Sequence, residues 1–316
     1  MKLLSVVFSF RNEQSNIKEL VRRTVLALEK LNNWNLELIF INDDSTDSSE
    51  GILIELQKQY PIKIVNMSRR FGVGPCVLAG LKLSNGDAVV YMDSDLQDPP
   101  EIIPQLIEKF EKGNDVVHTR RTKRFEESAL KLFLTKMAYR VINMSSNIPL
   151  PLDSGDFKLL SRRAVTHVNE LNEHNPYIRG LTVWVGFNQD FVDYERQGRF
   201  SGDSKFTFLS IKYWYGATAE FVRGITGYST GPLFLGIFVG LFAILFSFLL
   251  IIYTLYSKFI GTAIPGSSGI VIALSFFSGM ILTTIGITGL YIARIYEQTQ
   301  GRPRYIIKNI LEKNNK

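Results

Sequence analysis

The chain is poor in the residues that build disulfides and cysteine-based metal centres. Its 316 residues include one cysteine, Cys76, and three histidines. A single cysteine excludes an internal disulfide and a cysteine-based zinc site. His118, His167 and His174 are not spaced as metal ligands, so we expect these side chains to be structural or solvated.

Charged residues are missing from two long stretches toward the C-terminal end. No Asp, Glu, Lys or Arg occurs at residues 224–257, and after Lys258 none occurs until Arg294. A helix needs roughly 20 apolar residues to cross a bilayer, so we expect spans at 232–256 and 270–293. The alternative is a buried helical hairpin in a large soluble core. Apolar side chains on every face of both stretches disfavour that alternative.

The flanks of the two expected spans differ in charge. The segment between them is rich in Gly, Ser and Pro, which predicts a short turn, and its one charged residue is Lys258. From Arg294 onward the chain carries six Lys or Arg against two Glu. Because Lys and Arg favour cytoplasmic flanks, we expect a multi-pass protein of the inner (plasma) membrane, with residues 1–223 and both termini in the cytoplasm.

Neither a secretory signal nor a nucleic-acid-binding charge pattern is present. Arg11 and Glu13 follow the first strand-like run where a signal peptide would continue as a long apolar region. The formal net charge of +6 lies mostly in the C-terminal tail, and residues 1–223 are nearly neutral. We therefore expect no nucleic-acid partner, and we expect the tail at 295–316 to contact anionic lipid head groups.

Strand-like apolar runs alternate with helical segments over the first 119 residues. The expected strands are 4–10, 36–41, 62–66, 88–92 and 115–119, and the expected helices are 16–31, 48–60, 74–83 and 101–111. Strands separated by helices of this length predict a parallel, doubly wound α/β sheet. Ligands bind such sheets at the carboxyl ends of the strands, so the loops after these strands should form the site.

Polar side chains gather in each of those loops. Carboxylates there can bind ribose hydroxyls, base edges or a metal, whereas arginines suit phosphate. Taken alone, Ser45, Thr46 and Asp47 are equally well explained as helix N-caps. The polar segments are 11–13, 42–47, 68–72 and 93–97, followed by Arg120 and Arg121 after the fifth strand.

The densest loop reads Asp-Ser-Asp-Leu-Gln-Asp-Pro-Pro from Asp93 to Pro100. Residues i and i+2 of an extended chain point the same way, so Asp93 and Asp95 repel each other unless a cation lies between them. A hard divalent cation takes carboxylate oxygens together with phosphate oxygens. The competing interpretation is a turn that starts a helix at Pro99 or Pro100 with Asp98 as its N-cap. Both interpretations can hold together.

Six segments in order, ahead of two membrane spans, resemble the family 2 glycosyltransferases of the GT-A fold. More narrowly, the whole chain resembles the polyprenyl-phosphate glycosyltransferases, which include bactoprenol glucosyltransferases and dolichol-phosphate mannose synthases. The resemblance implies a Rossmann-like, doubly wound and mostly parallel sheet, followed by interfacial helices and two transmembrane helices. The six segments are 6–13, 42–47, 70–72, 93–100, 155–160 and 196–206.

The resemblance also implies where a nucleotide-sugar donor binds. Glu13, Asp43 and Asp44 would hold its nucleoside, and Asp93 would lie near its ribose and phosphates. Arg70 and Gly72 of the third loop are further donor-binding candidates. The sequence departs from the family pattern at three positions, which leaves the phosphate contacts of the third loop open: Ser9, Arg70 and Val73 replace a common proline, asparagine and lysine.

The remaining implied roles concern the metal and the reaction. Asp95 and Gln97 would ligate Mg²⁺ or Mn²⁺ on the donor diphosphate, and Asp156 would be the catalytic carboxylate, with Asp93 beside it. An acceptor phosphate has its second pKa near 6, so we expect Asp156 to position the acceptor or steady the sugar more than to remove a proton. The alternative for Asp156 is a turn residue. The expected phosphate-binding residues are Arg120, Arg199 and Lys205.

The acceptor side needs cations near the membrane. An aromatic and basic segment at 206–221 fits an interfacial helix, although a core helix is the alternative. Further cations considered for the acceptor are Arg121, Lys123, Arg124, Arg162 and Arg163, although a solvated basic surface is the favoured interpretation for most of them. The expected domains are a catalytic domain at 1–204, interfacial amphipathic helices at 205–229, a transmembrane hairpin at 230–294 and the basic cytoplasmic tail at 295–316.

The predicted activity is inverting transfer of a hexose to a polyprenyl phosphate at the cytoplasmic membrane face. Glucose, UDP-glucose and undecaprenyl phosphate as the specific substrates rest on the resemblance alone, and a GDP-mannose-dependent mannosyltransferase is the alternative. A processive polysaccharide synthase is disfavoured, because the chain lacks a Gln-x-x-Arg-Trp motif and further spans. A non-catalytic scaffold is disfavoured by the intact acidic loops. Small residues in the spans could pack helices within one chain or between copies in a homo-oligomer.

Overall fold

An eight-stranded sheet organises residues 1–198, which we call the catalytic half after the role expected from the sequence. Its strand order is β7-β5-β6-β4-β1-β2-β3-β8, with β8 contributed by the C-terminal part of the chain. The computed structural model describes residues 1–29, 31–124, 140, 151, 154–171, 173–174, 176–198, 200, 218, 222, 224–261 and 268–312. The strands are β1 (Lys2–Phe10), β2 (Trp34–Asn42), β3 (Ile62–Met67), β4 (Ala88–Asp93), β5 (Val116–Arg124), β6 (Ser154–Ser161), β7 (Gln189–Arg196) and β8 (Ile307–Leu311).

The helices alternate with the strands, as the hydrophobic periodicity predicts. The helices of the first half are α1 (Ile17–Leu28), α2 (Ser49–Leu56), α3 (Val73–Leu83), the 3-10 turn η1 (Pro100–Ile102) and α4 (Ile103–Glu111). Those of the second half are α6 (Arg162–Glu170), α7 (Ile178–Trp184), α9 (Gly231–Phe259) and α10 (Ser268–Thr299). Each of the five expected strands and four expected helices is present within a few residues of its predicted bounds.

The sheet is mostly parallel, which confirms the predicted fold class. Strand β1 pairs in parallel with β2 and β4, β2 pairs in parallel with β3, and β5 does so with β7. Strand β6 lies between β4 and β5 and is antiparallel to both. Strand β8 is antiparallel to β3. The carboxyl ends of β1 to β5 therefore share one edge with the amino end of β6.

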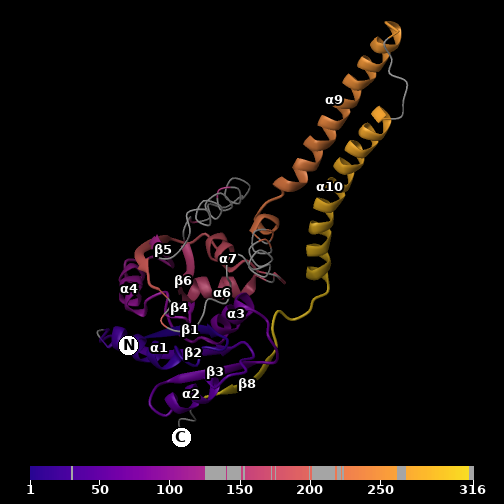
Figure 1. The fold of residues 1–316 in the computed structure, drawn as a ribbon. Coiled ribbons are helices and arrows are strands. Elements are labelled where there is room, and N and C mark those ends of the chain that lie inside the picture. Colours follow the sequence, from indigo (N-terminus) through magenta and orange to yellow (C-terminus); the bar gives the residue numbers. More distant parts are fainter. Residues whose placement is uncertain are drawn as a thin grey trace.

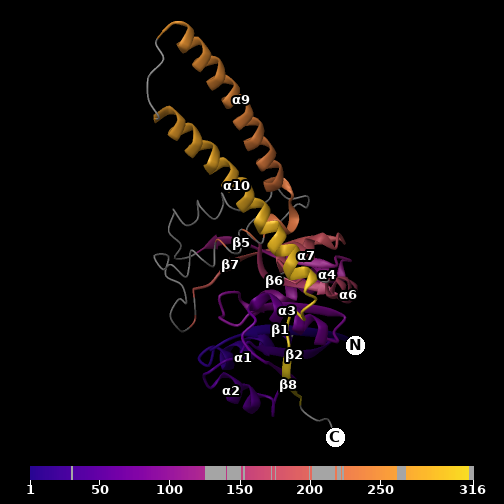
Figure 2. The ribbon, with the colours of Figure 1, turned by 90° about the vertical axis from the view of Figure 1, so that its right-hand side faces the viewer.

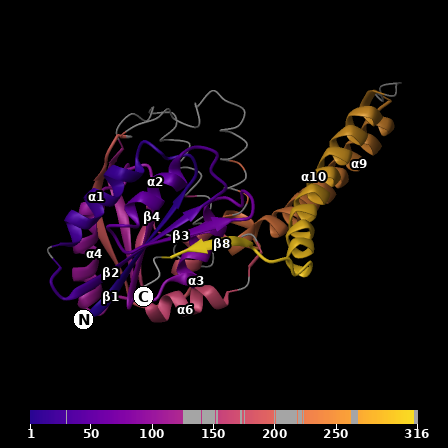
Figure 3. The ribbon, with the colours of Figure 1, turned by 90° about the horizontal axis from the view of Figure 1, so that it is seen from below.

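Both faces of the sheet are buried, because side chains of a strand point alternately to opposite faces. On one face Val6, Phe8 and Phe10 of β1 pack with α1 and α4. On the other face Val7 packs with residues of α3, α6 and α7. Figure 3 shows α1 and α4 on one side of the sheet and α3 and α6 on the other. This doubly wound arrangement leaves the carboxyl edge uncovered by these helices.

Helices α9 and α10 form a hairpin that extends away from the sheet (Figure 1). By length and composition, Gly231–Phe259 and Phe276–Thr299 can each cross a membrane, and their side chains are not buried in the protein. The expected spans at 232–256 and 270–293 lie inside these two helices. The hairpin contacts the catalytic half near its base, where Arg294 Nη2 lies 3.4 Å from Glu173 Oε2.

Most of the expected interfacial segment, residues 205–217, lies outside the described residues. The end of the segment is described, and Tyr228 there is buried against the core on the α3–α7 side of the sheet. Its hydroxyl donates a hydrogen bond to the carbonyl of Tyr177 at 3.3 Å. This end of the segment therefore belongs to the core of the catalytic half.

The chain beyond the hairpin returns to the sheet, which the sequence did not predict. After α10 it runs along the catalytic half and adds β8 to the edge of β3 (Figure 2). Gln57 Nε2 donates to the carbonyl of Leu311 at 2.9 Å, and Lys63 pairs with Glu312 at 2.9 Å. Part of the expected basic tail is therefore a strand of the sheet.

Candidate active site

Four strand exits along the carboxyl edge contain a residue with positive φ. These are Asn12 after β1, Asp44 after β2, Gly72 after β3 and Leu96 after β4, with φ of 56°, 59°, 93° and 59°. Positive φ is uncommon outside glycine, and for a bulky residue such as leucine it is an outlier. Such backbone conformations cluster at ligand-binding and catalytic sites. The edge therefore has the backbone geometry of a functional site.

The loops after β1 and β2 are joined by hydrogen bonds between their side chains and backbones. The Asn12 backbone nitrogen donates to Ser45 Oγ at 3.0 Å, and the Thr46 backbone nitrogen donates to Asn12 Oδ1 at 2.8 Å. Glu13 is buried, and its Oε2 accepts from Asn16 Nδ2 at 2.6 Å. Asp44 is exposed at the surface of the loop. Of these two expected nucleoside contacts, Asp44 is the more accessible.

Asp43 fixes the loop after β3. Its Oδ1 accepts from Phe71 N at 2.6 Å, and its Oδ2 accepts from Gly72 N at 3.0 Å. Arg70 lies in the same loop and is exposed. The structure thus places Asp43, Arg70 and Gly72 together, but with Asp43 as the residue that shapes the loop.

The loop after β4 carries the expected metal ligands. Asp93, Asp95 and Gln97 are half-buried, and Gln97 N donates to Asp95 Oδ1 at 3.2 Å. Burial and the negative charges of Asp156, Asp95 and Asp98 raise the pKa of Asp93 to about 7. A site that disfavours its own negative charges is suited to a cation.

The donor set of this loop fits Mg²⁺ or Mn²⁺. Within the described ranges, no three His, Cys, Asp or Glu side chains are grouped closely enough to hold a metal by themselves. Mg²⁺ is usually held by one or two carboxylates plus waters and substrate phosphates. Asp95, with the amide oxygen of Gln97 and with Asp93 beside it, supplies that small number of oxygen ligands.

Strand β6 brings Asp156 to the same place. Tyr91 of β4 pairs with Lys158 of β6 in an antiparallel register, and two residues further toward the edge this register sets Asp93 opposite Asp156. Arg179 Nε and Nη2 donate to the two Asp156 oxygens at 2.9 and 2.7 Å. Burial alone would raise the pKa of Asp156, but the paired Arg179 guanidinium holds it well below its usual range. Asp156 is therefore an ionised carboxylate at neutral pH.

Arg179 had no motif to mark it in the sequence. It lies in the first turn of α7, where Ile178 and Leu181 face the core. The one available signal was a charged residue inside a short apolar helix.

Arg121, rather than Arg120, points into the site. Arg120 pairs with Asp193 of β7 at 2.7 Å, and both side chains are about half exposed. Arg121 is mostly buried and lies over Gly155, where an added Cβ would come within 2.6 Å of its Nη2. Adjacent residues of a strand point to opposite faces. The structure thus does not bring Arg120 to the acidic residues, and Arg121 occupies that position.

Asp98 does not cap a helix, which corrects the expected N-cap. The turn η1 does begin at Pro100, but no side chain caps it. Asp98 is 1% exposed and lies 3.5 Å from both Arg121 Nη2 and Arg196 Nε. The Tyr194 hydroxyl donates to it. Asp98 therefore anchors the loop after β4 to β5 and β7.

Arg162 and Arg163 are not brought to the site. Arg162 donates to the carbonyl of Gly86 at 2.8 Å, and Arg163 pairs with Asp115. Gly86 and Asp115 precede β4 and β5, so both arginines lie at the opposite edge of the sheet, away from the acidic loops. Arg199, Lys205 and the side chains of Lys123 and Arg124 lie outside the described residues.

A buried polar row lies beneath Asp156. Lys158, which is 1% exposed, donates to Thr182 Oγ1 at 3.2 Å and pairs across the sheet with His118. Burial lowers the pKa of Lys158 to about 7. His118 Nε2 lies 2.8 Å from Gln189 Oε1, and its Nδ1 has no hydrogen-bond partner in the part of the chain that the structure describes.

His118 should make the fold sensitive to acid. Burial and the Lys158 charge lower its pKa from 6.5 to about 3, so between these values the unfolded chain binds a proton that the folded chain does not. Stability therefore falls as pH drops through this window. In His118→Gln, the thermal unfolding midpoint should depend less on pH from 6.5 down to 3 than in the wild type. Identical pH dependence in the two proteins would contradict this assignment.

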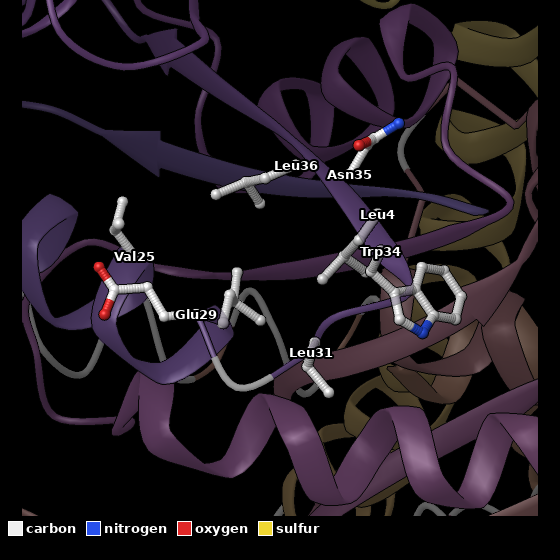
Figure 4. Close-up of a pocket in the computed structure, with 8 residues that line it drawn as sticks. Leu4, Val25, Glu29, Leu31, Trp34, Asn35 and Leu36 are labelled. Carbon is white, nitrogen blue, oxygen red and sulfur yellow. The ribbon is translucent and has the colours of Figure 1, made fainter. Parts of the chain in front are cut away.

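A cavity of about 190 Å³ lies at the opposite end of the sheet (Figure 4). It is lined by apolar residues such as Leu4, Leu31 and Trp34, with Glu29 and Asn35 at its margin. None of the expected site residues lines it. It lies near the amino ends of β1 and β2 and has no part in the carboxyl-edge site.

A doubly wound α/β sheet with polar loops at its carboxyl edge is a common setting for a ligand-binding site, and comparison with known proteins establishes the family. Residues 5–168 match the family described as Glycosyl transferase family 2. The chain belongs to this family and is therefore a glycosyltransferase.

Curated relatives match nearly the whole chain. A bactoprenol glucosyl transferase of Shigella phage SfX is 37% identical over 311 residues, covering 97% of this chain and 99% of the relative. An uncharacterized glycosyltransferase of Bacillus subtilis, YkcC, is 37% identical over 306 residues, covering 96% and 93%. The prophage bactoprenol glucosyl transferase homolog of Escherichia coli is 35% identical over 309 residues, covering 97% and 99%.

Solved structures match more distantly. A glucosyl-3-phosphoglycerate synthase from Mycobacterium tuberculosis, in complex with Mn²⁺ and UDP-glucose, has a TM-score of 0.47 at 20% identity, covering 71% of this chain and 78% of that chain. A mannosyltransferase from Pyrobaculum calidifontis, in complex with GDP-Man and Mn²⁺, has a TM-score of 0.44 at 11% identity, covering 95% and 76%.

Proposed function

We propose that the protein transfers glucose from UDP-glucose to a polyprenyl phosphate, namely undecaprenyl phosphate. The observation that carries the proposal is the match, over nearly the full length, to proteins named bactoprenol glucosyl transferase. The α9–α10 hairpin falls within this match, and it would hold the enzyme at a membrane that contains the lipid acceptor. The charge bias around the hairpin supports a cytoplasmic location for the catalytic half.

In this proposal, different residues of the carboxyl edge bind different parts of the donor. Asp44 and Glu13 line the region for the nucleoside, and Asp43 shapes the neighbouring loop around Gly72. Asp95 and Gln97, with Asp93 beside them, would hold Mg²⁺ or Mn²⁺. The bound metal would neutralise negative charge on the leaving diphosphate. Arg121 adds a fixed positive charge beside Gly155.

Asp156 acts on the sugar in this proposal. Its pairing with Arg179 keeps it ionised, so it suits stabilisation of positive charge that develops at the anomeric carbon. An oxygen of the acceptor phosphate forms the new bond to the anomeric carbon. The bond between that carbon and the donor diphosphate breaks at the same time, and the nucleoside diphosphate is the leaving group. Since the acceptor phosphate is largely deprotonated at neutral pH, no strong base is needed. Direct attack inverts the anomeric configuration.

The proposal predicts a labelled lipid product. Full-length protein in detergent, given labelled UDP-glucose, undecaprenyl phosphate and Mg²⁺ or Mn²⁺, should form glucosyl phosphoryl lipid, and a chelator should stop the reaction. A reaction without the lipid is the control. Parallel reactions with GDP-mannose test the alternative donor. If no UDP- or GDP-sugar yields a lipid product, the proposed function is wrong.

A further inference from the structure

Strand β8 ends a segment that leaves the catalytic half, passes through the hairpin and comes back. Its register with β3 pairs Val65 with Ile310 and Asn66 with Asn309, and the pairing shifts between Asn66 and Met67. Figures 2 and 3 show β8 at the sheet edge beside β3, with α10 leading to it. Part of the catalytic sheet is therefore built by residues that follow both candidate spans.

A chain of side-chain amides runs from β8 to the loop after β2. Asn66 Nδ2 donates to Asn309 Oδ1 at 2.9 Å, and Asn42 Nδ2 donates to Asn66 Oδ1 at 2.9 Å. Asn42 Oδ1 in turn accepts from Ser45 N at 2.9 Å. Asn42 and Asn66 are 4% and 6% exposed. Buried amides of this kind need defined partners. Asn66 Nδ2 also donates to Glu50 Oε1 at 2.7 Å, so Asn309 and Glu50 together fix the orientation of Asn66, which in turn fixes that of Asn42.

The chain of amides ends at a loop of the active-site edge. Ser45 follows Asp43 and Asp44 directly, and its Oγ accepts the bond from Asn12 of the neighbouring loop. The position of Asn42 therefore affects both loops that we assign to the donor nucleoside.

A second contact joins the returning chain to the loop after β3. Ser68 N donates to the carbonyl of Ile306 at 2.9 Å. At its other end the same loop is held by Asp43, which accepts from Phe71 N and Gly72 N. Tyr305 and Ile307 pack against the same core cluster as Phe71. The returning chain thus holds the start of this loop, and Asp43 holds its end.

We propose that Asn309 is a positioning residue for donor binding, which acts through Asn66 and Asn42 on the loop after β2 and, through the Ser45–Asn12 bond, on the loop after β1. The proposal rests on the proposed function only where it assigns these loops to the nucleoside of the donor. It follows that the donor site reaches its final geometry only when the chain beyond the hairpin has docked on β3.

The chemistry of Asn309 provides a matched set of variants. Asn309 is an acceptor in this contact, so Asn309→Asp retains the oxygen and Asn309→Ala removes it. Asn309 is exposed, and Asn66 Nδ2 keeps its bond to Glu50 in both variants, so global stability should change little in either variant. Lys308→Ala is the control, because Lys308 is exposed on the same strand and has no part in the chain of amides.

The first measurement is hydrogen exchange of backbone amides in the full-length protein without nucleotide. In Asn309→Ala, amides of residues 11–13 and 43–47 should exchange faster than in the wild type, with the rest of the sheet unchanged. Asn309→Asp and Lys308→Ala should match the wild type. Unchanged protection of both loops in Asn309→Ala would overturn the proposal, whatever the donor is.

The second measurement is calorimetric binding of UDP and UDP-glucose, with GDP and GDP-mannose in parallel, together with transfer kinetics. Asn309→Ala should weaken nucleotide binding and raise the donor KM by about five-fold, the effect of one net hydrogen bond. Its kcat and acceptor KM should not change, and Asn309→Asp should restore donor affinity. Faster exchange with unchanged nucleotide affinity would overturn the role in donor binding. Wild-type protein that binds no nucleotide would contradict the proposed function instead.

Discussion

Replacing Asp95 by alanine is expected to abolish metal-dependent transfer and to leave the fold intact. Asp95 is half-buried at the end of β4, in a loop whose anchor to the sheet is the separate residue Asp98. Its loss removes a carboxylate from the small donor set of the metal. Electrostatic groups that act on the leaving charge contribute roughly 100-fold or more to the rate, so we expect transfer to fall at least to that extent.

The measurement is lipid-linked transfer across a titration of Mg²⁺ and Mn²⁺, paired with thermal unfolding of the same preparation. Asn114→Ala is a suitable control, because this residue lies before β5 at the opposite edge and bonds to the carbonyl of Lys109. Full activity of Asp95→Ala would remove Asp95 from the metal site. Loss of activity together with loss of folding would show that Asp95 is a structural residue.

Asp98 lies three residues further along the same loop. Replacing it by alanine is expected to lower the stability of the fold, unlike Asp95→Ala. The fold should lose stability, because Arg121 and Arg196 would keep their positive charges in a buried site without the carboxylate. Removing one partner of a buried ion pair costs roughly 3–5 kcal/mol. Thermal or denaturant unfolding of Asp98→Ala measures the loss.

A second substitution separates the charge from the hydrogen bond. Asp98→Asn retains an oxygen that can accept from the Tyr194 hydroxyl but removes the negative charge. Its stability should lie between that of the wild type and that of Asp98→Ala. If Asp98→Ala unfolds like the wild type, Asp98 does not anchor the loop, and an activity defect in that variant would then indicate a direct role in catalysis.

The parts of the fold that depend on local pattern were predictable from the sequence. The alternation of apolar runs with amphipathic segments predicts β1 to β5 and the helices between them, because the hydrophobic pattern that marks each element lies within its own residues. Strand β8 shows the limit. It pairs with β3 across 243 positions of sequence, and no local signal states which distant strand covers an edge.

In the site, too, local sequence patterns predicted some residues correctly, whereas contacts from distant strands decided the others. The order of acidic loops placed Asp93 and Asp95 at a strand end, where the structure has them. Asp98 looked like an N-cap because the local pattern of acid and proline favours one, but its partners Arg121 and Arg196 come from distant strands. The choice between Arg120 and Arg121 depends on the irregular pairing of β5 with β6, which strand periodicity alone does not reveal.

The return of the chain to β3 has a consequence for biosynthesis. Asn66 leaves the ribosome 243 residues before Asn309, so throughout that interval β3 is an unprotected edge with unpaired backbone groups. Exposed edges of this kind recruit other strands and promote aggregation. In the nascent chain the β3 edge is therefore open to pairing with other strands until β8 has been made.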